Sequence, residues 1–420
     1  MTSWMKEKAT ACFGPVSRYG RMNRDDDDDE DDGAEDAQLW FRDLAPHSLG
    51  EFSFAVVRGN PVLEDQSQVE TCRNFTFLGV YDGHGGPEAS QYVIDRLFPH
   101  FSKISLLCLK LLWIVIYLGF AGENGAISEV VLRNAIGATE DGFLNVVREI
   151  VGTKPSIVAV GSCCLVGVLW KGTLHIANLG DSRAVMGVLN RFHKIVAEPL
   201  TSDHNACSEE IRRELRSQHP EDPHILVQKN GVWRIKGVIQ VSRAIGDAHL
   251  KSTEFVLDPS IPRYQLNEPL TRPVLSAEPS IHTRVIGPRD KFLIFASDGL
   301  WDHLTNQEAA ELVHKYPRAG IAKKLIKKAL KVAAKKQHMT YTQLLQKRPP
   351  RRQLHDDITV IVLFFDRKLL DKQTAVQQLS VHGFMDNAAL PDLSFVDGIN
   401  TNQVKRDDAW GNCCISVGNC

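Results

Sequence analysis

Three groups that could do chemistry together stand next to one another in this chain, at Asp82, Gly83 and His84. The apolar run 75–79 comes just before them, and such a run is typical of a buried strand. The end of that strand would hold a carboxylate, a backbone carbonyl and an imidazole at one rigid point. An ordinary Asp-Gly turn beside a satisfied histidine would have the same short sequence, so the motif alone leaves both interpretations open.

Three further apolar runs also border on an aspartate. Asp181 and Asp298 each come just after such a run, and Asp356 comes just before the run 358–365, whose β-branched residues are typical of a strand. If these strands lie side by side, their carboxylates form a cluster in which like charges raise one another's pKa. Hard divalent cations such as Mg²⁺ or Mn²⁺ would neutralise that cluster, since they prefer oxygen ligands. The pattern therefore predicts a divalent metal site.

Seven short motifs, spread over residues 48 to 367, extend this pattern. They are Glu64-Asp65, Tyr81-Asp82-Gly83-His84-Gly85-Gly86, Gly161-Ser162, Gly180-Asp181-Ser182-Arg183, Val241-Ser242-Arg243-Ala244-Ile245-Gly246-Asp247, Ser297-Asp298-Gly299-Leu300-Trp301-Asp302 and Asp356-Asp357-Ile358-Thr359-Val360-Ile361. In this order they resemble the metal-dependent serine/threonine protein phosphatases of type 2C. The sequence of residues 63–68 is similar to that of plant members. The resemblance implies an α+β fold, a four-layer α-β-β-α sandwich of two antiparallel sheets flanked by helices.

The resemblance also implies a reaction and a set of metal ligands. The reaction is the hydrolysis of phosphoserine and phosphothreonine in proteins by a water molecule that two Mg²⁺ or Mn²⁺ ions activate. Both ions would share Asp82, with the carbonyl of Gly83 as a further ligand. Asp298 and Asp356 would complete the ligands of one ion. Glu64 would reach the other ion directly or through water.

Further roles follow from the same resemblance. Asp181 and Asp302 match positions that hold a weaker third ion in some members, and His84 matches the residue proposed as general acid for the leaving group. Direct attack by a metal-activated water needs no covalent phosphoenzyme.

The chain departs from the family pattern four residues before the acidic pair. Many members carry an arginine there that binds the substrate phosphate, whereas this chain has Asn60. An amide donates hydrogen bonds but lacks the bidentate charge of a guanidinium. Arg58 could supply that charge, because on an alternating strand it would share a face with Asn60. A solvated arginine at position 58 is the alternative.

The composition indicates one large domain between two less regular ends. The chain has 420 residues, of which 43% are hydrophobic, and we expect the catalytic domain to span residues 48–367. Residues 1–47 form an N-terminal segment whose part 25–36 holds ten acids and no base, which predicts disorder. A solvated tail is the simple interpretation of this tract, and a weak pseudosubstrate that folds back on the basic body is the other. Residues 368–420 form a C-terminal tail.

The sequence Ile104 to Gly122 is the anomaly of the chain, because it is long and apolar enough for a membrane span and has Lys110 as its single charge. One crossing would, however, separate Asp82 from Asp181 and Asp298, which the metal site needs together. We therefore expect an interfacial or buried helix, or an apolar insertion in the catalytic domain.

Two other classes of function stay open beside the enzyme. One is a catalytically weakened protein that binds phosphoproteins, and the other is a membrane-tethered regulator. Phosphoproteins are the expected partners, and the basic run 347–352 alone does not lead us to expect nucleic-acid binding. We expect a monomer. Since no secretory signal is present, we expect it in the cytoplasm or nucleus, with peripheral association with the plasma membrane as the alternative.

Overall fold

Two six-stranded antiparallel sheets pack face to face in this computed structural model, which describes residues 36–71, 75–117, 128–259, 261–266, 268–366 and 379–383. The first sheet contains, in spatial order, β1 (Leu39–His47), β2 (Gly50–Val57), β16 (Ile358–Phe365), β15 (Asp290–Ala296), β9 (Arg183–Leu189) and β10 (Ile195–Pro199). The second contains β14 (Ser280–Val285), β8 (Thr173–Leu179), β7 (Cys164–Trp170), β4 (Phe75–Tyr81), β3 (Gln66–Thr71) and β17 (Leu379–His382).

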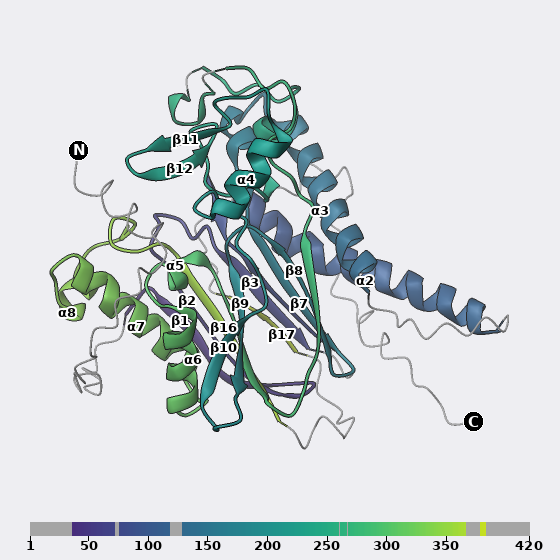
Figure 1. Ribbon diagram of the computed structural model, residues 1–420, viewed down its shortest axis with the longest axis vertical. Coiled ribbons are helices and arrows are strands. Elements are labelled where there is room, and N and C mark those ends of the chain that lie inside the picture. Colours follow the sequence, from purple (N-terminus) through teal and green to yellow (C-terminus); the bar gives the residue numbers. More distant parts are fainter. Residues whose placement is uncertain are drawn as a thin grey trace.

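Helices cover the outer face of each sheet (Figure 1). On the second sheet lie α2 (Glu88–Tyr117) and α3 (Glu129–Ile150), and on the first lie α6 (Asn306–Lys315) and α7 (Ile321–Lys336). The shorter helices are α4 (Glu209–Gln218), α5 (Asp298–Trp301), α8 (Tyr341–Leu345), η1 (Pro155–Ala159), η2 (Ala248–Leu250) and η3 (Pro262–Tyr264). This arrangement confirms the predicted α-β-β-α sandwich.

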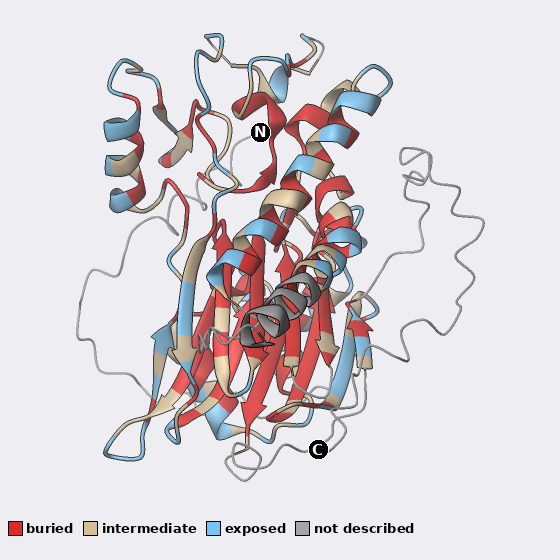
Figure 2. Ribbon diagram, turned by 90° about the vertical axis from the view of Figure 1, so that its right-hand side faces the viewer, coloured by how far each residue is buried: buried red, intermediate tan, exposed pale blue. Residues whose placement is uncertain are grey.

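The core follows from the alternation of side chains along the strands. In β2, Phe52 and Phe54 point into the layer between the two sheets, whereas Ala55 and Val57 point toward α6 and α7. Every residue of β16 is buried, because sheet lies on one side of it and helix on the other. Figure 2 shows this buried interior running through both sheets. Such a rigid base can hold side chains at strand ends in fixed positions.

Both edges of the sandwich reach beyond the domain limits that we expected. Strand β1 lies inside the segment 1–47 and pairs with β2, and Trp40 packs edge-on against Phe54 with ring centroids 5.1 Å apart. Strand β17 lies inside the segment 368–420 and pairs with β3, where it buries Val381. These edge strands cover hydrophobic residues of the core. The sequence did not predict them, because the hydrophobic periodicity is weak near both ends of the chain. The acidic tract 25–36 lies outside the described residues except for Asp36.

Helix α2 carries the first part of the anomalous apolar sequence. The helix continues through Tyr117, and Figure 1 shows it projecting from the sandwich. The side chains described in it extend to Ser105, and Ile104 packs against the core beneath α2 and α3. The rest of the predicted segment up to Gly122 lies outside the described side chains. Among the described residues, no helix has both the length and the apolar content needed to cross a membrane.

A small lobe lies at one end of the sandwich (Figure 1). It contains α4, the hairpin of β11 (Leu226–Lys229) and β12 (Val232–Ile235), and a hydrophobic cluster that includes Ile211, Leu215 and Ile235. Beside it, the short strands β13 (Ile245–Gly246), β6 (Gly161–Ser162) and β5 (Gly83–His84) form a three-stranded sheet. That sheet ties the Asp-Gly-His motif to the base of the lobe.

Candidate metal centre

Three aspartates meet where strands of both sheets end. Asp82 follows β4, Asp181 lies just after β8, and Asp298 follows β15 and begins α5. Each offers a carboxylate oxygen, and these three oxygen atoms lie within 4.8 Å of one another. Strands β4 and β8 belong to one sheet and β15 to the other, so the sandwich itself holds the group together. The predicted clustering of these three residues is therefore what the structure shows.

The electrostatics of this triad favour a bound cation. Burial first, and then the facing Asp298 carboxylate, raise the pKa of Asp82 well above its ordinary value. The same two causes raise the pKa of Asp181 to about 6. A divalent cation would remove this repulsion and restore the charged forms. The donor set consists of carboxylate oxygens, which fits Mg²⁺ or Mn²⁺.

Asp356 and Glu64, two further predicted ligands, lie beside the triad but not within it. Asp356 stands just before β16, at the same end of the sheet as Asp298, because Ala296 of β15 pairs with Val360 of β16. The pKa of Glu64 is raised by burial and by Asp357. Whether Glu64 and Asp356 bind metal stays a prediction.

Gly83 occupies a position that admits no side chain. A Cβ atom at Gly83 would lie 2.4 Å from the carbonyl oxygen of Glu64. Glycine therefore lets the chain that carries Asp82 pass close to the chain that carries Glu64. This close approach is the structural reason for glycine between Asp82 and His84.

His84 has a buried carboxylate as its partner. Its Nε2 atom lies 2.8 Å from Oδ2 of Asp247, and the side chain of Asp247 is only 2% exposed. Burial alone would lower the pKa of His84, but the charge and hydrogen bond of Asp247 outweigh it, so the pKa is raised. A Cβ atom on Gly161 would lie 2.3 Å from Asp247 Oδ2 and 2.5 Å from His84 Nε2, so glycine leaves room for this pair. We had assigned no role to Asp247, although it ends one of the quoted motifs.

Asp357 organises the backbone around the predicted ligands. Its Oδ1 atom accepts hydrogen bonds from the backbone N–H groups of Gly59 at 2.7 Å and Asn60 at 2.9 Å. Its Oδ2 atom accepts from the N–H groups of Glu64 at 2.7 Å and Asp65 at 3.4 Å. One buried carboxylate thus fixes the segment that carries Glu64. The Asp356-Asp357 pair was the sequence signal for this buried carboxylate, but the pair does not show which of the two side chains points inward.

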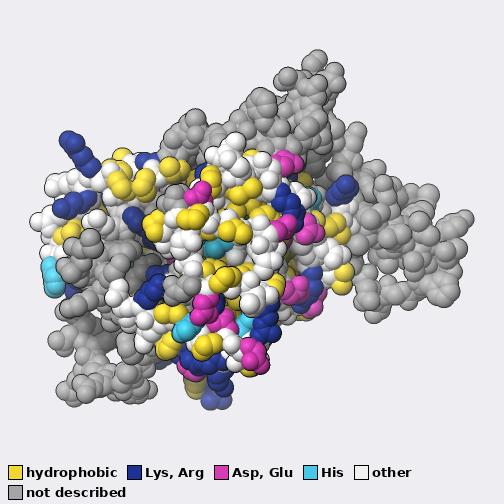
Figure 3. Space-filling view, turned by 90° about the horizontal axis from the view of Figure 1, so that it is seen from above, with side chains coloured by type: hydrophobic (Ala, Val, Ile, Leu, Met, Phe, Trp, Pro, Cys, Tyr) yellow, Lys and Arg dark blue, Asp and Glu magenta, His cyan; other side chains and the backbone are white. Residues whose placement is uncertain are grey.

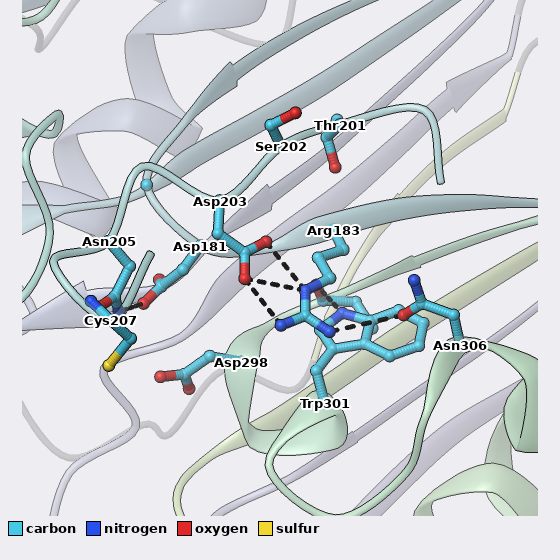
Figure 4. Close-up of polar contacts among 12 residues, drawn as sticks. Asp181, Arg183, Thr201, Ser202, Asp203, Asn205, Cys207, Asp298, Trp301 and Asn306 are labelled. Atoms are coloured by element: carbon cyan, nitrogen blue, oxygen red, sulfur yellow. Dashed lines mark hydrogen bonds and ion pairs between the residues drawn. The ribbon is translucent and has the colours of Figure 1, made fainter. Parts of the chain in front are cut away.

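Asp181 is held by polar neighbours that Figure 4 shows. Asn205 donates from Nδ2 to Asp181 Oδ2 at 2.6 Å. Nearby, Arg183 binds Asp203 through Nε at 2.8 Å and Nη2 at 2.7 Å, and its guanidinium lies over the ring of Trp301 at 5.8 Å. Arg183 is therefore a fixed structural cation at the rim of the triad. Sequence reasoning missed Asn205, since an isolated asparagine carries no motif.

The remaining predicted residues lie farther out or point elsewhere. Asp302 is exposed and lies one helical turn after Asp298, outside the triad. Strand β2 ends at Val57, so Arg58 and Asn60 do not alternate along a strand as we expected. Arg58 donates to the Gln38 side chain at 2.6 Å, and Asn60 is buried and donates to Asp356 Oδ1 at 3.0 Å.

Comparison with known proteins agrees with this geometry. Residues 62–338 match the sequence model of the family described as Protein phosphatase 2C. The chain is 57% identical to "Probable protein phosphatase 2C 68" of Arabidopsis thaliana over 395 residues, which cover 91% of this chain and 96% of that protein. It is 54% identical to "Probable protein phosphatase 2C 25" of Oryza sativa subsp. japonica over 403 residues, covering 95% and 100% of the two chains.

Solved structures share the fold at lower identity. The serine-threonine phosphatase 2C from Toxoplasma gondii aligns with a TM-score of 0.53 and 17% identity, over 78% of this chain and 99% of its own. A C. elegans sex determining protein aligns with a TM-score of 0.51 and 20% identity, over 76% of this chain and 66% of its own. At these identities the likeness concerns the fold alone.

The family model covers more than half of this chain, and the plant relatives align over nearly all of it. Their agreement with the aspartate triad decides the assignment. The chain belongs to the protein phosphatase 2C family as a plant-type member, and it is a metal-dependent protein phosphatase.

Proposed function

We propose that this phosphatase hydrolyses phosphoserine and phosphothreonine in proteins with two Mg²⁺ or Mn²⁺ ions at the candidate metal centre. The observation that carries the proposal is the triad of Asp82, Asp181 and Asp298, whose carboxylate oxygens lie within 4.8 Å of one another. Asp82 and Asp298 are the ligands that we expect to matter most, with Asp356 and Glu64 at the border of the triad. The bound ions would supply an activated water molecule and neutralise charge on the phosphoryl group.

The two outer aspartates of the motifs have a weaker assignment. Asp181 belongs to the triad itself, and Asp302 lies one helical turn beyond Asp298. A third, weaker ion near Asp181 fits this geometry, since Asn205 binds Oδ2 and, among the described residues, Oδ1 has only the weak Cys163 thiol donor at 3.4 Å. Asp302 would have to reach such an ion from the exposed side.

His84 would donate the proton that the leaving serine or threonine oxygen requires. Asp247 fixes the imidazole and favours its protonated form, which is the form that a general acid needs. The carboxylate of Asp247 is buried, so its partner ring is held in one orientation. Loss of either residue should therefore affect the departure of the leaving group.

The decisive experiment is phosphate release from a phosphothreonine peptide with Mn²⁺ or Mg²⁺. We expect release that depends on the ion, stops with chelator, and is lost in Asp298→Asn. Asp141→Asn is a matched control, because Asp141 is exposed on α3 and outside the centre. Release by Asp298→Asn at the rate of the unchanged chain would contradict the proposal.

The chain would act on phosphoproteins as a monomer in the cytoplasm or nucleus, or while associated peripherally with the plasma membrane. Figure 3 looks down on the end that carries the small lobe, where acidic and basic side chains lie close together beside hydrophobic ones. Such a mixed surface suits varied protein substrates better than a polyanion. Light scattering and cell fractionation test the oligomeric state and the location.

A further inference from the structure

A phosphorylated side chain carries between one and two negative charges at neutral pH, and the centre that would receive it is lined by carboxylates. A cationic side chain facing the centre would help to hold it. Guanidinium groups suit this task because they donate two parallel hydrogen bonds to phosphate oxygens. The arginines near the centre differ in how far other partners already occupy them.

Three of these arginines are bound to the protein. Arg183 makes the bidentate contact with Asp203 and a further hydrogen bond to Asn306. Arg58 donates to Gln38 through both Nε and Nη2. Arg351 is buried in an ion pair and points away from the solvent.

Arg352 is different. Its Nη1 atom contacts Oδ2 of Asp356, and its side chain is 37% exposed, against 17% for that of Asp356. The other N–H donors of its guanidinium have no partner within the part of the chain that the structure describes. Oδ1 of Asp356 already accepts from the side chain of Asn60 and from the backbone N–H of Asp357, both at 3.0 Å. Arg352 is thus a partly exposed cation that contacts a predicted metal ligand, Asp356.

The backbone holds Arg352 in this position. The N–H group of Arg351 donates to the carbonyl of Gly59 at 2.7 Å, and the carbonyl of Arg351 accepts from Leu354 at 2.7 Å and His355 at 3.1 Å. Arg351 turns into the protein, so its neighbour Arg352 turns outward. These backbone hydrogen bonds fix the turn that carries Arg352, so its side chain stays within reach of Asp356.

The charge of Arg352 reaches the site. Burial and Asp357 raise the pKa of Glu64, while His84 and Arg352 act in the opposite direction. Glu64 therefore lies within the electrostatic reach of both the predicted general acid and this arginine. The positive charges of Arg352 and His84 both favour the ionised form of Glu64.

We propose that Arg352 is a phosphate-binding residue, whose guanidinium binds oxygen atoms of the substrate phosphoryl group beside Asp356. It supplies the charged contact that Asn60 cannot, because Asn60 is buried and its amide is bonded to Asp356. The inference rests on the proposed phosphatase function. Its competitor is a role confined to neutralising Asp356, and the two roles differ in what is lost when Arg352 is removed.

The test compares Arg352→Ala and Arg352→Lys with Arg348→Ala, a control at an exposed arginine of the same loop. Three quantities are measured: calorimetric affinity for inorganic phosphate with Mn²⁺ present, calorimetric affinity for Mn²⁺ alone, and KM and kcat on a phosphothreonine peptide. We expect Arg352→Ala to weaken phosphate binding and raise KM by about tenfold, with kcat and Mn²⁺ affinity little changed. Lysine should recover part of the loss, and Arg348→Ala should match the unchanged chain.

Two results would overturn the proposal. One is phosphate affinity in Arg352→Ala equal to that of the unchanged chain. The other is a loss of Mn²⁺ affinity with phosphate affinity retained, which would confine Arg352 to holding Asp356. Thermal unfolding of each variant checks the fold, and Arg352→Lys carries the test if the alanine variant does not fold. Failure of the function itself is recognised separately, since the unchanged chain would then release no phosphate from the peptide.

Discussion

His84 and the buried Asp247 form a hydrogen-bonded pair, with Nε2 and Oδ2 2.8 Å apart, although 163 residues separate them in the chain. Strands β5, β6 and β13 bring them together: β6 pairs with both of the others, and Gly161 of β6 leaves space for the two side chains. The pair links the small lobe to the metal centre. Any account of the leaving-group chemistry has to include both residues.

A double-mutant cycle tests whether the pair acts as a unit. We expect His84→Gln to reduce kcat on a phosphothreonine peptide by about 10²- to 10⁴-fold, the usual contribution of a general acid. Asp247→Asn should produce a smaller loss, and the double variant should resemble His84→Gln, since Asp247 acts through the ring. All losses should shrink on an aryl phosphate with a good leaving group. Equal losses on both substrates would indicate a structural role for the pair.

Asp82→Asn should abolish turnover and leave the fold intact. Asp82 is half-buried, and burial together with the nearby carboxylates, first Asp298, raises its pKa, so an amide at this position removes an unfavourable charge. The unfolding temperature in chelator should therefore be unchanged or higher, while activity with Mn²⁺ is lost. Circular dichroism and peptide turnover measure the two effects, with Asp141→Asn as control. Full activity at saturating Mn²⁺ would refute the assignment of Asp82.

How far the sequence predicts this site depends on what each residue does. Asp82, Asp181 and Asp298 follow recognisable strands, so their meeting could be expected before the fold was known. Asp247 and Asn205 could not be found in that way, because contacts between distant segments depend on sheet pairing and loop paths. The role of a residue then follows from its partner rather than from its type.

Local backbone geometry explains why the expected alternation of Arg58 and Asn60 along a strand was wrong. Arg58 and Asn60 share a face only on a continuous strand, but β2 ends at Val57 and the four hydrogen bonds to Asp357 bend the chain just after it. The edge strands β1 and β17 were missed for a different reason. An edge strand needs few buried residues, so its hydrophobic pattern is weak.

The buried ion pair of Asp36 and Arg351 should be important for stability. Arg351 Nη1 lies 2.6 Å from Asp36 Oδ2, with side-chain exposures of 4% and 0%. Arg351→Met leaves the buried Asp36 carboxylate without its charged partner and with only the Gln38 N–H donor, and breaking a buried ion pair in this way typically costs about 3–5 kcal/mol. Asp36→Leu combined with Arg351→Met should recover much of that loss. Urea unfolding measures both, and a loss in Arg351→Met no larger than in the exposed control Arg348→Met would contradict this.

Acid should destabilise the protein partly through His47. Burial lowers the pKa of His47 from 6.5 to about 4, and its Nε2 atom lies 3.0 Å from the carbonyl oxygen of Phe364. The unfolded chain binds a proton more readily than the folded one, so this stability is present above pH 6.5 and lost as the pH falls toward 4. The contribution is at most about 3 kcal/mol.

His47→Gln cannot take up that proton. The free-energy difference between the unchanged chain and this variant should therefore shrink as the pH falls from 6.5 to 4, as urea unfolding at several pH values would show. His282→Gln is the control, because His282 is exposed on β14. A difference that stays constant over this range would mean that His47 does not titrate on unfolding.

The apolar continuation of α2 should be dispensable for catalysis. The helix buries Val93, Leu97 and Phe101 in the core, and Ile104 still packs against it. Replacing residues 106–122 by a flexible polar linker keeps these contacts, so turnover should persist while the soluble yield rises. Leu97→Asp, which places a charge in the core, is the contrasting variant and should destabilise the protein.

The metal centre supplies the physical argument against a single membrane crossing by this segment. Asp82 precedes the segment, Asp181 and Asp298 follow it, and their carboxylate oxygens lie within 4.8 Å of one another. A crossing would place the first residue and the other two on opposite sides of the bilayer, and the triad could not form. Membrane retention that resists carbonate and depends on residues 106–122, with protease protection of only one half of the chain, would overturn this conclusion. Release by carbonate with the activity recovered in the supernatant is the result that we expect.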